Sequence, residues 1–449
     1  MQGPTQDTDA RAAVVFPRAA TALVALVAAL TSPAGAALNA AAPIGSAPFV
    51  SPGDPPAWRA LSAAEQQLFD LGHAVFNTPF VPQGTPGAGR RSGLGPLFNA
   101  AACDECHNEG AHGRGPLGEG PAPAALVMEL QTMVGAERSE AGDPSYGRVF
   151  NTHAIAGVAA EGEVLIHYSS RDGHFADGTS WNLRAPRYEL SGLHYGPLEP
   201  TTVLEPRIAP TLFGLGLLEA VSRPQMRSPL GSVEAGHFNW QGTAYSILEQ
   251  TTRAFSREMG LTTSVLPRDD CTLTQVGCGR LSAAARVPEV QEELLQALLD
   301  FEHWVAVPTP LPTGAVAPPR GSAELFAALG CVACHQSRLQ VTLDMPLQGR
   351  REQVIAPYTD LRLHDLGRAL DDMTVEGRPV QSRWRTAPLW GLGYRMRHPL
   401  AQTFLHDGRA RSVDEAILWH EGEALRAREA YLKLNAAERE QLLQFLSCL

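Results

Sequence analysis

Two stretches decide the fold class expected of this chain: CDECH at residues 103–107 and CVACH at residues 331–335. Both have the Cys-x-x-Cys-His spacing of covalent c-type haem, in which two thiols bond the vinyl groups and the adjacent imidazole binds iron. A zinc site would need both cysteine pairs in one place, and a thioredoxin-like dithiol would not need a following histidine twice. We therefore expect two covalently bound haem c groups. The attachment residues would be Cys103, Cys106, Cys331 and Cys334, and the iron ligands His107 and His335.

The sequence around these motifs is repeated. RIAPTLFGLG at 207–216 returns as RTAPLWGLG at 385–393, and GTAYSILE at 242–249 returns as GRARSVDE at 408–415. A predicted helix followed by Cys-x-x-Cys-His is the third matched block, so the order indicates a duplicated domain. The histidine-to-arginine interval is 100 residues in the first copy and 50 in the second. The extra length coincides with strand-like segments, which we interpret as an insertion.

These observations predict a mainly α fold with two cytochrome c-like haem domains, the first carrying a β-containing insertion. Capping boxes at Ser62 and Asn435, a serine cap at Ser412 and an amphipathic run at 290–305 predict helices, and AALVMEL and EVLIHY predict strands. The predicted domains are a signal peptide at 1–36, a linker at 37–57, an N-terminal haem domain at 58–306 with its insertion at about 120–195, a linker at 307–321 and a C-terminal haem domain at 322–449.

The N-terminus resembles an export signal. Arg11 and Arg18 precede a short apolar run, and Ala34-Gly35-Ala36 is a small-residue cleavage signal. A hydrophobic N-terminal helix is the alternative. Export predicts a periplasmic protein with no membrane span in the mature chain, and it permits a disulfide between Cys271 and Cys278. Cys448, on an apolar terminal helix, is expected to be a packed residue.

The composition restricts the classes of molecule with which the protein is expected to interact. The chain has 449 residues, 44% of them hydrophobic, and a net charge of −11, which argues against a nucleic-acid binder. An acidic protein of this kind suits a basic, soluble redox partner protein, or a small uncharged substrate such as hydrogen peroxide.

The two copies differ where a second axial ligand would stand. The capped helix after Ser412 carries His420, which we expect to complete the second iron's ligand set, although a packed histidine is the alternative. The equivalent residue in the first copy is Ala254, which cannot bind iron. The first haem is therefore expected to be five-coordinate, unless one of three histidines or a methionine from the insertion fills the position. These histidines are His112, His153 and His167.

Several motifs resemble the dihaem oxidoreductase family, related to bacterial dihaem cytochrome c peroxidases. They include GLGPLFNAAACDECH, ALGCVACH, YTDLRLHDLGRALDD, WRTAPLWGLG and FLHDGRARSVDEAILWHEGEA. The resemblance implies that a distal ligand falls on His420, where the peroxidases have Met or Tyr, and that a catalytic distal glutamate falls on Glu249. Glu249 also completes a capping box from Ser246, which is an equal alternative. Calcium occurs in related enzymes, but the sequence has no ligand motif for it.

We therefore expect a peroxidase-like oxidoreductase in which the first haem activates peroxide, Glu249 moves the proton, and the bis-histidine second haem transfers electrons. Two alternatives stay open. One is a non-enzymatic dihaem electron-transfer cytochrome, and the other is an oxidase that acts on an organic or protein substrate through a ferryl state.

Overall fold

The computed structural model describes residues 45–49, 54–110, 112–135, 137–139, 141–222, 235–282, 288–309, 318–345, 349–398 and 403–449. All of them belong to one structural unit, Ala40–Leu449. The predicted signal peptide at 1–36 lies outside the described residues, as do most of the linker at 37–57 and residues 310–317 of the second linker. The predicted domain boundaries therefore stay predictions.

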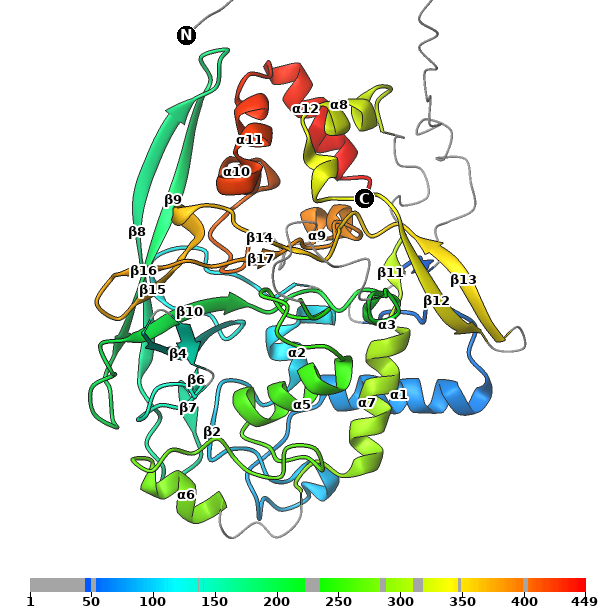
Figure 1. Cartoon of the computed structure of the whole chain (residues 1–449). Coiled ribbons are helices and arrows are strands. Elements are labelled where there is room, and N and C mark those ends of the chain that lie inside the picture. The colour runs from blue at the N-terminus through cyan, green and yellow to red at the C-terminus, as the bar shows by residue number, and fades with distance from the viewer. Residues whose placement is uncertain are drawn as a thin grey trace, which may run out of the picture. The chain divides into compact units, whose positions relative to one another are not determined.

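The helices are short and spread along the chain (Figure 1). They are α1 (Ala63–Asn77), α2 (Cys103–Cys106), α3 (Leu215–Glu219), α5 (Ile247–Glu258), α6 (Val276–Ser282), α7 (Glu292–Trp304), α8 (Ser322–Ala328), α9 (Leu392–Arg397), α10 (Val413–Leu418), α11 (Leu425–Leu432) and α12 (Ala436–Leu446).

Strands occur in both halves. They are β1 (Ser46–Ala47), β2 (Leu97–Phe98), β3 (Gly120–Pro121), β4 (Leu126–Val134), β5 (Glu137–Ser139), β6 (Val149–Phe150), β7 (His153–Ala154), β8 (Glu163–His174), β9 (Ser180–Ser191), β10 (Thr202–Ile208), β11 (Val307–Pro308), β12 (Leu339–Met345), β13 (Gly349–Ile355), β14 (Leu363–His364), β15 (Asp372–Thr374), β16 (Pro379–Val380) and β17 (Trp384–Arg385).

The prediction of a mainly α fold is wrong. The structure is 29% helical and 24% strand, and it contains a curled half-barrel sheet. That sheet has the order β16-β15-β10-β4-β5, with β6 also pairing β4. β10 is buried along its whole length and pairs antiparallel with β4 on one side and with β15 on the other. Through β10, the sheet therefore joins strands from the predicted insertion to two strands from the C-terminal half, β15 and β16. Local sequence patterns do not reveal a pairing between strands so far apart in the chain.

Each half of the chain contributes a hairpin to the hydrophobic core of the other half. Phe175 and Leu183, from the β8–β9 hairpin, are buried in the core built around the C-terminal helices. Val341 and Leu343, from the β12–β13 hairpin, are buried in the core built around α1, α5 and α7. Alternating apolar residues in each strand supply the buried face. The two halves are thus fixed to each other by hydrophobic burial from both directions.

Local signals fixed several helices as expected. The Ser62 hydroxyl accepts a hydrogen bond from the Glu65 N–H while the Glu65 carboxylate accepts from the Ser62 N–H, and Asn435 with Glu438 forms the same box on α12. α1 packs on α7 so closely that a Cβ at Gly72 would stand 2.0 Å from the Ala297 carbonyl oxygen.

The repeated sequence blocks have repeated geometry. Phe238 bridges to Ala244 in the first copy, and Phe404 bridges to Ala410 in the second. After each turn a serine caps the next helix, with the glutamate N–H 3.1 Å from the serine hydroxyl in both copies. The structure thus places the two sequence repeats in equivalent local folds.

Candidate functional site

The first Cys-x-x-Cys-His motif forms one helical turn, α2, and the His107 N–H donates to the Cys103 carbonyl at 2.9 Å. The His107 ring is fixed by a second contact, because its Nδ1 lies 2.8 Å from the Pro210 carbonyl oxygen. A carbonyl only accepts, so Nδ1 carries the hydrogen and Nε2 keeps its lone pair. Desolvation lowers the pKa of His107 to about 4, so the imidazole is neutral, as an iron ligand must be.

The second motif has the same construction. The His335 N–H donates to the Cys331 carbonyl at 2.9 Å, and His335 Nδ1 lies 3.0 Å from the Tyr358 carbonyl oxygen. Desolvation lowers the pKa of His335 to about 4 as well. Each motif thus presents two cysteines and a neutral imidazole with a free Nε2, which is the donor set that covalent haem requires.

A large cavity opens beside the first motif, with about 1110 Å³ of space between protein atoms, part of it continuous with solvent. Cys106 and His107 line it from one element, and Ala254 lines it from α5. Among the described residues that line the cavity, His107 is the only histidine, and none is a methionine or a tyrosine. The cavity therefore offers one histidine ligand and no second strong ligand for iron.

The α5 face toward this cavity is polar on both sides of Ala254. Gln250, Arg257 and Glu258 line the cavity with it, as expected for residues spaced by three and four on one helix face. The Gln250 Oε1 atom is buried and has no hydrogen-bond partner among the described residues. Glu258 accepts a hydrogen bond from the Asn99 side chain at 3.2 Å. Desolvation, followed by the nearby Glu129 carboxylate, raises the pKa of Glu258 to about 7.

Glu249, the predicted catalytic acid, pairs with Arg253, which lines the cavity. Its carboxylate accepts from the Tyr245 N–H at 2.8 Å and pairs with Arg253 at 2.5 Å, at the start of α5. It is not among the residues that line the cavity. Sequence reasoning missed Glu258, although its position four residues after Ala254 placed it on the same helix face.

His420 stands two residues beyond the end of α10. Its Nδ1 lies 2.7 Å from the Ala416 carbonyl oxygen, which again leaves Nε2 for a metal, and desolvation lowers its pKa. Desolvation is the main cause of the lowered pKa of His335, and electrostatic repulsion from His420 adds to it. His335 and His420 thus each have Nδ1 on a carbonyl oxygen, which leaves Nε2 for a metal.

The other histidines proposed for the first iron do not line its cavity. His112 is buried with its ring edge-on to Trp240, and its Nδ1 lies 3.0 Å from the Gly113 carbonyl oxygen. His153 stacks on Phe98. His167 lies 3.4 Å from the Glu189 carboxylate on the β8–β9 hairpin.

Trp240 contacts both halves of the chain. It lines the first cavity, donates its indole N–H to the Ile208 carbonyl at 2.7 Å, and packs against the core of the C-terminal helices. Its own carbonyl accepts the N–H of Arg385 at 2.8 Å. Trp240 therefore lies between the cavity beside the first motif and the core of the C-terminal helices.

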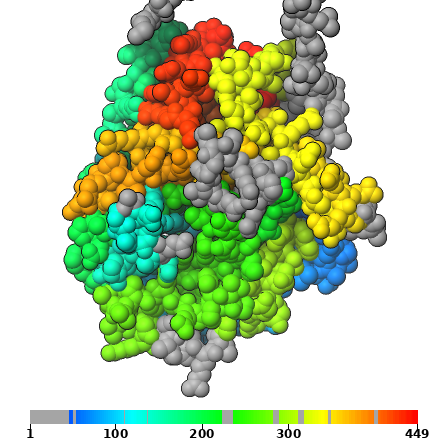
Figure 2. All heavy atoms as spheres, in the orientation of Figure 1, coloured from blue at the N-terminus to red at the C-terminus, as the bar shows by residue number. Residues whose placement is uncertain are grey.

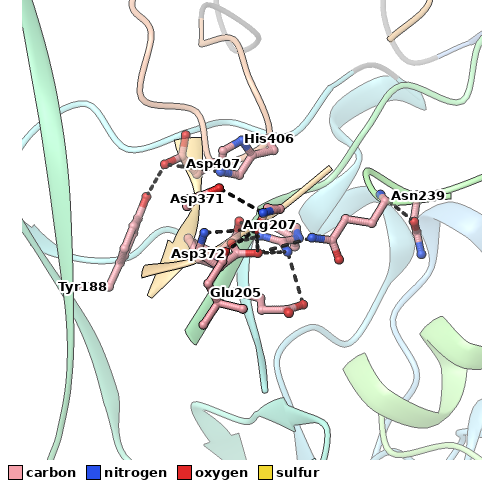
Figure 3. Close-up of polar contacts among 12 residues, drawn as sticks. Tyr188, Glu205, Arg207, Asn239, Asp371, Asp372, His406 and Asp407 are labelled. Carbon is pink, nitrogen blue, oxygen red and sulfur yellow. Dashed lines mark hydrogen bonds and ion pairs between the residues drawn. The ribbon is translucent and has the colours of Figure 1, made fainter. Parts of the chain in front are cut away.

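The matched arginines of the two repeats have different partners. Arg207 makes two hydrogen bonds to Asp372, at 2.8 and 2.9 Å, and one to Glu205 at 3.2 Å (Figure 3). Arg385 is 8% exposed, and its Nη1 has no hydrogen-bond partner among the described residues. Desolvation lowers the Arg385 pKa to about 10. A buried guanidinium calls for an anion, and the carboxylates of a haem would supply one.

The remaining predictions concern a disulfide, the packing of Cys448 and a calcium site. Cys271 and Cys278 are placed at bonding distance, with Cα atoms 5.8 Å apart. Cys448 is buried, as expected of a packed residue. Within the described ranges, one group has metal-ligand spacing, Cys334 with Asp360 and His364. This group includes Cys334 of the second motif and has one carboxylate. It does not resemble a calcium site, because calcium is bound by six to eight oxygen ligands.

Comparison with known proteins gives a family. The family model described as "Di-haem oxidoreductase, putative peroxidase" matches residues 223–449, just over half of the chain. No curated protein matches. Among solved structures, hydrazine synthase of Kuenenia stuttgartiensis, pressurised with 20 bar xenon, is 13% identical over 90% of this chain and 95% of that chain. Its TM-score is 0.32, a likeness too weak to bear on fold or function.

Every helix in the described part of the chain is too short or too polar to cross a bilayer. The family match agrees with the two haem-type motifs and implies haem cofactors. The chain belongs to the di-haem oxidoreductase family.

Proposed function

We propose that the protein is a periplasmic, peroxidase-like enzyme with two covalently attached haem groups. Cys103 and Cys106 would hold the first haem and Cys331 and Cys334 the second. The observation that carries the proposal is the cavity in which His107 faces no second strong ligand while an acid, Glu258, lines the wall beside Ala254. A haem with one open axial position binds and activates a small ligand such as hydrogen peroxide.

The chain's own residues supply the polar part of the reaction. Near neutral pH the Glu258 carboxyl is divided between its protonated and ionised forms, so it can take a proton from peroxide and return one to the leaving oxygen. Gln250 offers an amide to orient the substrate. Asn99 fixes the Glu258 carboxyl through a hydrogen bond at 3.2 Å. We place the proton transfer on Glu258 because it lines the cavity, whereas the Glu249 carboxylate does not and is engaged by the Tyr245 N–H and by Arg253.

The second haem would be an electron carrier, with His335 and His420 as axial ligands through their free Nε2 atoms. Trp240 would connect the two sites, and the electrons would come from a soluble redox partner protein. Export would place the mature chain in the periplasm, where Cys271 and Cys278 would be joined covalently.

Optical and electron paramagnetic resonance spectra of the purified ferric protein test the proposal. We expect one high-spin haem that reacts with hydrogen peroxide and one low-spin haem that does not. His420→Ala should abolish the low-spin signal and leave the high-spin signal. Two low-spin haems inert to peroxide would refute the enzymatic role and favour an electron-transfer cytochrome.

A further inference from the structure

We propose that the β8–β9 hairpin is a positioning element for His420 and that Arg171 is its positioning residue. The inference rests on the proposed role of His420 as an axial ligand, and the experiment below separates the two. The hairpin belongs to the first half of the chain, yet its outer part lies beside the C-terminal helices. Figure 2 shows its atoms next to those of the last helices.

Arg171 contacts the residues on both sides of His420. Its Nη2 atom lies 2.6 Å from the Glu421 carboxylate, and its guanidinium lies 5.8 Å from the centre of the Trp419 ring. An ion pair and a cation–π contact thus hold the two chain neighbours of the ligand. Trp419 is 1% exposed and also contacts Arg409, so its ring position is closely defined.

The hairpin can hold this segment because its own end is anchored. The Phe175 ring packs edge-on against Tyr431, with centres 5.9 Å apart. The Ala176 N–H donates to the Leu432 carbonyl at 2.8 Å. Arg439 of α12 pairs with Asp177 at 2.9 Å. These contacts to α11 and α12 hold the hairpin in place against the C-terminal helices. Arg171 can therefore hold Trp419 and Glu421 in a fixed position.

A second set of contacts holds the same segment from the other direction. The Glu421 N–H donates to the Leu366 carbonyl at 3.2 Å, and the Glu423 N–H donates to the Asp365 carbonyl at 2.8 Å. His364 lies 2.8 Å from the Glu423 carboxylate. The segment after His420 is therefore clamped between β14 with its following loop and the β8–β9 hairpin.

His420 needs such a clamp because its helix does not reach it. α10 has six residues and ends at Leu418, and within the described part of the chain the His420 ring makes one hydrogen bond, from Nδ1 to the Ala416 carbonyl oxygen. Metal ligands act well only when neighbouring groups fix their orientation. Loosening the segment should make His420 easier to displace from iron without changing the donor atom.

The test compares four holoprotein variants: Arg171→Ala, Arg171→Lys, Arg187→Ala and His420→Ala. Arg187 is the matched control, since it lies on the same hairpin and its side chain is 69% exposed, 3.6 Å from Glu189. Cyanide is titrated against the low-spin signal of the second haem. A partly exposed ion pair contributes up to about 1 kcal/mol, so Arg171→Ala should raise the apparent cyanide affinity there by about 2- to 5-fold.

Arg171→Lys should restore most of the wild-type affinity, and Arg187→Ala should match wild type. If Arg171→Ala binds cyanide as wild type does while His420→Ala loses the low-spin signal, the positioning role is refuted and the ligand role stands. If His420→Ala keeps the low-spin signal, both the ligand role and the inference fail. Should Arg171→Ala not fold, Glu421→Gln removes the same ion pair together with the Arg428–Glu421 contact at 3.6 Å, so the cyanide affinity should rise at least as much.

Discussion

Replacing Glu258 with glutamine should remove a pH-dependent part of the protein's stability. Desolvation and the Glu129 carboxylate raise the Glu258 pKa from its ordinary value of 4.5 to about 7. Each unit of pKa difference between the folded and unfolded states corresponds to about 1.4 kcal/mol, so the shift corresponds to roughly 3 kcal/mol. The glutamine keeps the size and one acceptor oxygen but cannot ionise.

The direction follows from proton binding. Between about pH 4.5 and pH 7 the folded protein holds the Glu258 proton while the unfolded chain releases it. The free energy of unfolding therefore falls as the pH rises through this window. The stabilisation from the raised Glu258 pKa is fully present below the window and is lost above it.

Urea unfolding of the wild-type holoprotein and the variant at pH 4.5 and pH 8 measures the difference. We expect the wild type to lose roughly 3 kcal/mol more than Glu258→Gln between these two values. Glu302→Gln is the matched control. Burial raises the Glu302 pKa to about 7 as well, but Glu302 does not line the cavity.

Both variants should flatten the stability profile, whereas only Glu258→Gln should slow the reaction with hydrogen peroxide, by about 10²- to 10⁴-fold. A Glu258→Gln variant with the wild-type dependence of stability on pH would show that the carboxyl is ionised normally. Equal loss of peroxide reactivity in both variants would show that the position in the cavity does not matter. Either result would refute the assignment.

Three further predictions concern the scaffold and the open position. Arg207→Met removes the fully buried cation beside Asp372 and Glu205 and leaves them only Arg138, so it should lower the free energy of unfolding by about 3–5 kcal/mol in urea titrations; an unchanged midpoint would contradict the network. Gly72→Ala forces α1 away from the Ala297 carbonyl and should cost about 1–3 kcal/mol by the same assay, whereas tolerance would show that the helices can separate. Ala254→His should convert the first haem to a low-spin form, while Ala254→Leu, which cannot bind iron, should leave it high-spin.

Features set by neighbouring residues were predictable from the sequence. The capping boxes at Ser62 and Asn435 depend on contacts within three residues, and both form as expected. The Cys-x-x-Cys-His turns are local in the same sense, because each histidine N–H bonds the carbonyl four residues earlier.

Long-range pairing explains why the fold class was not predictable. β10 pairs with β15, more than 160 residues later, and no local pattern of Thr202–Ile208 specifies that partner. The apolar residues of β12 alternate visibly, but the haem motif eight residues before Leu339 favoured a helical domain. The sequence also did not predict that each hairpin packs into the core of the other half. Leu183 and Val341 are buried by residues from the other half, and no local pattern specifies these partners.

The difference between the two sites comes from where one helix ends. α5 and α10 begin with the same serine cap, yet α5 has 12 residues and α10 has six. Ten residues after the second cap stands Gly422, with φ of 53°, where a Cβ would lie 2.4 Å from the Asp365 carbonyl oxygen. α10 has already ended at Leu418, and Gly422, in a left-handed conformation that favours glycine, allows the segment after it to pack closely against Asp365.

The first copy has Ser256 at the equivalent offset, and α5 continues through it for two more residues. That continuation adds Glu258 to the face that already carries Ala254, and so brings an acid to the wall of an open cavity. In the second copy the early end releases His420 from the helix, and the clamp of Glu421 and Glu423 then has to fix it. In the roles that we propose, the position of one helix terminus separates a site with a proton donor from a site with a second ligand.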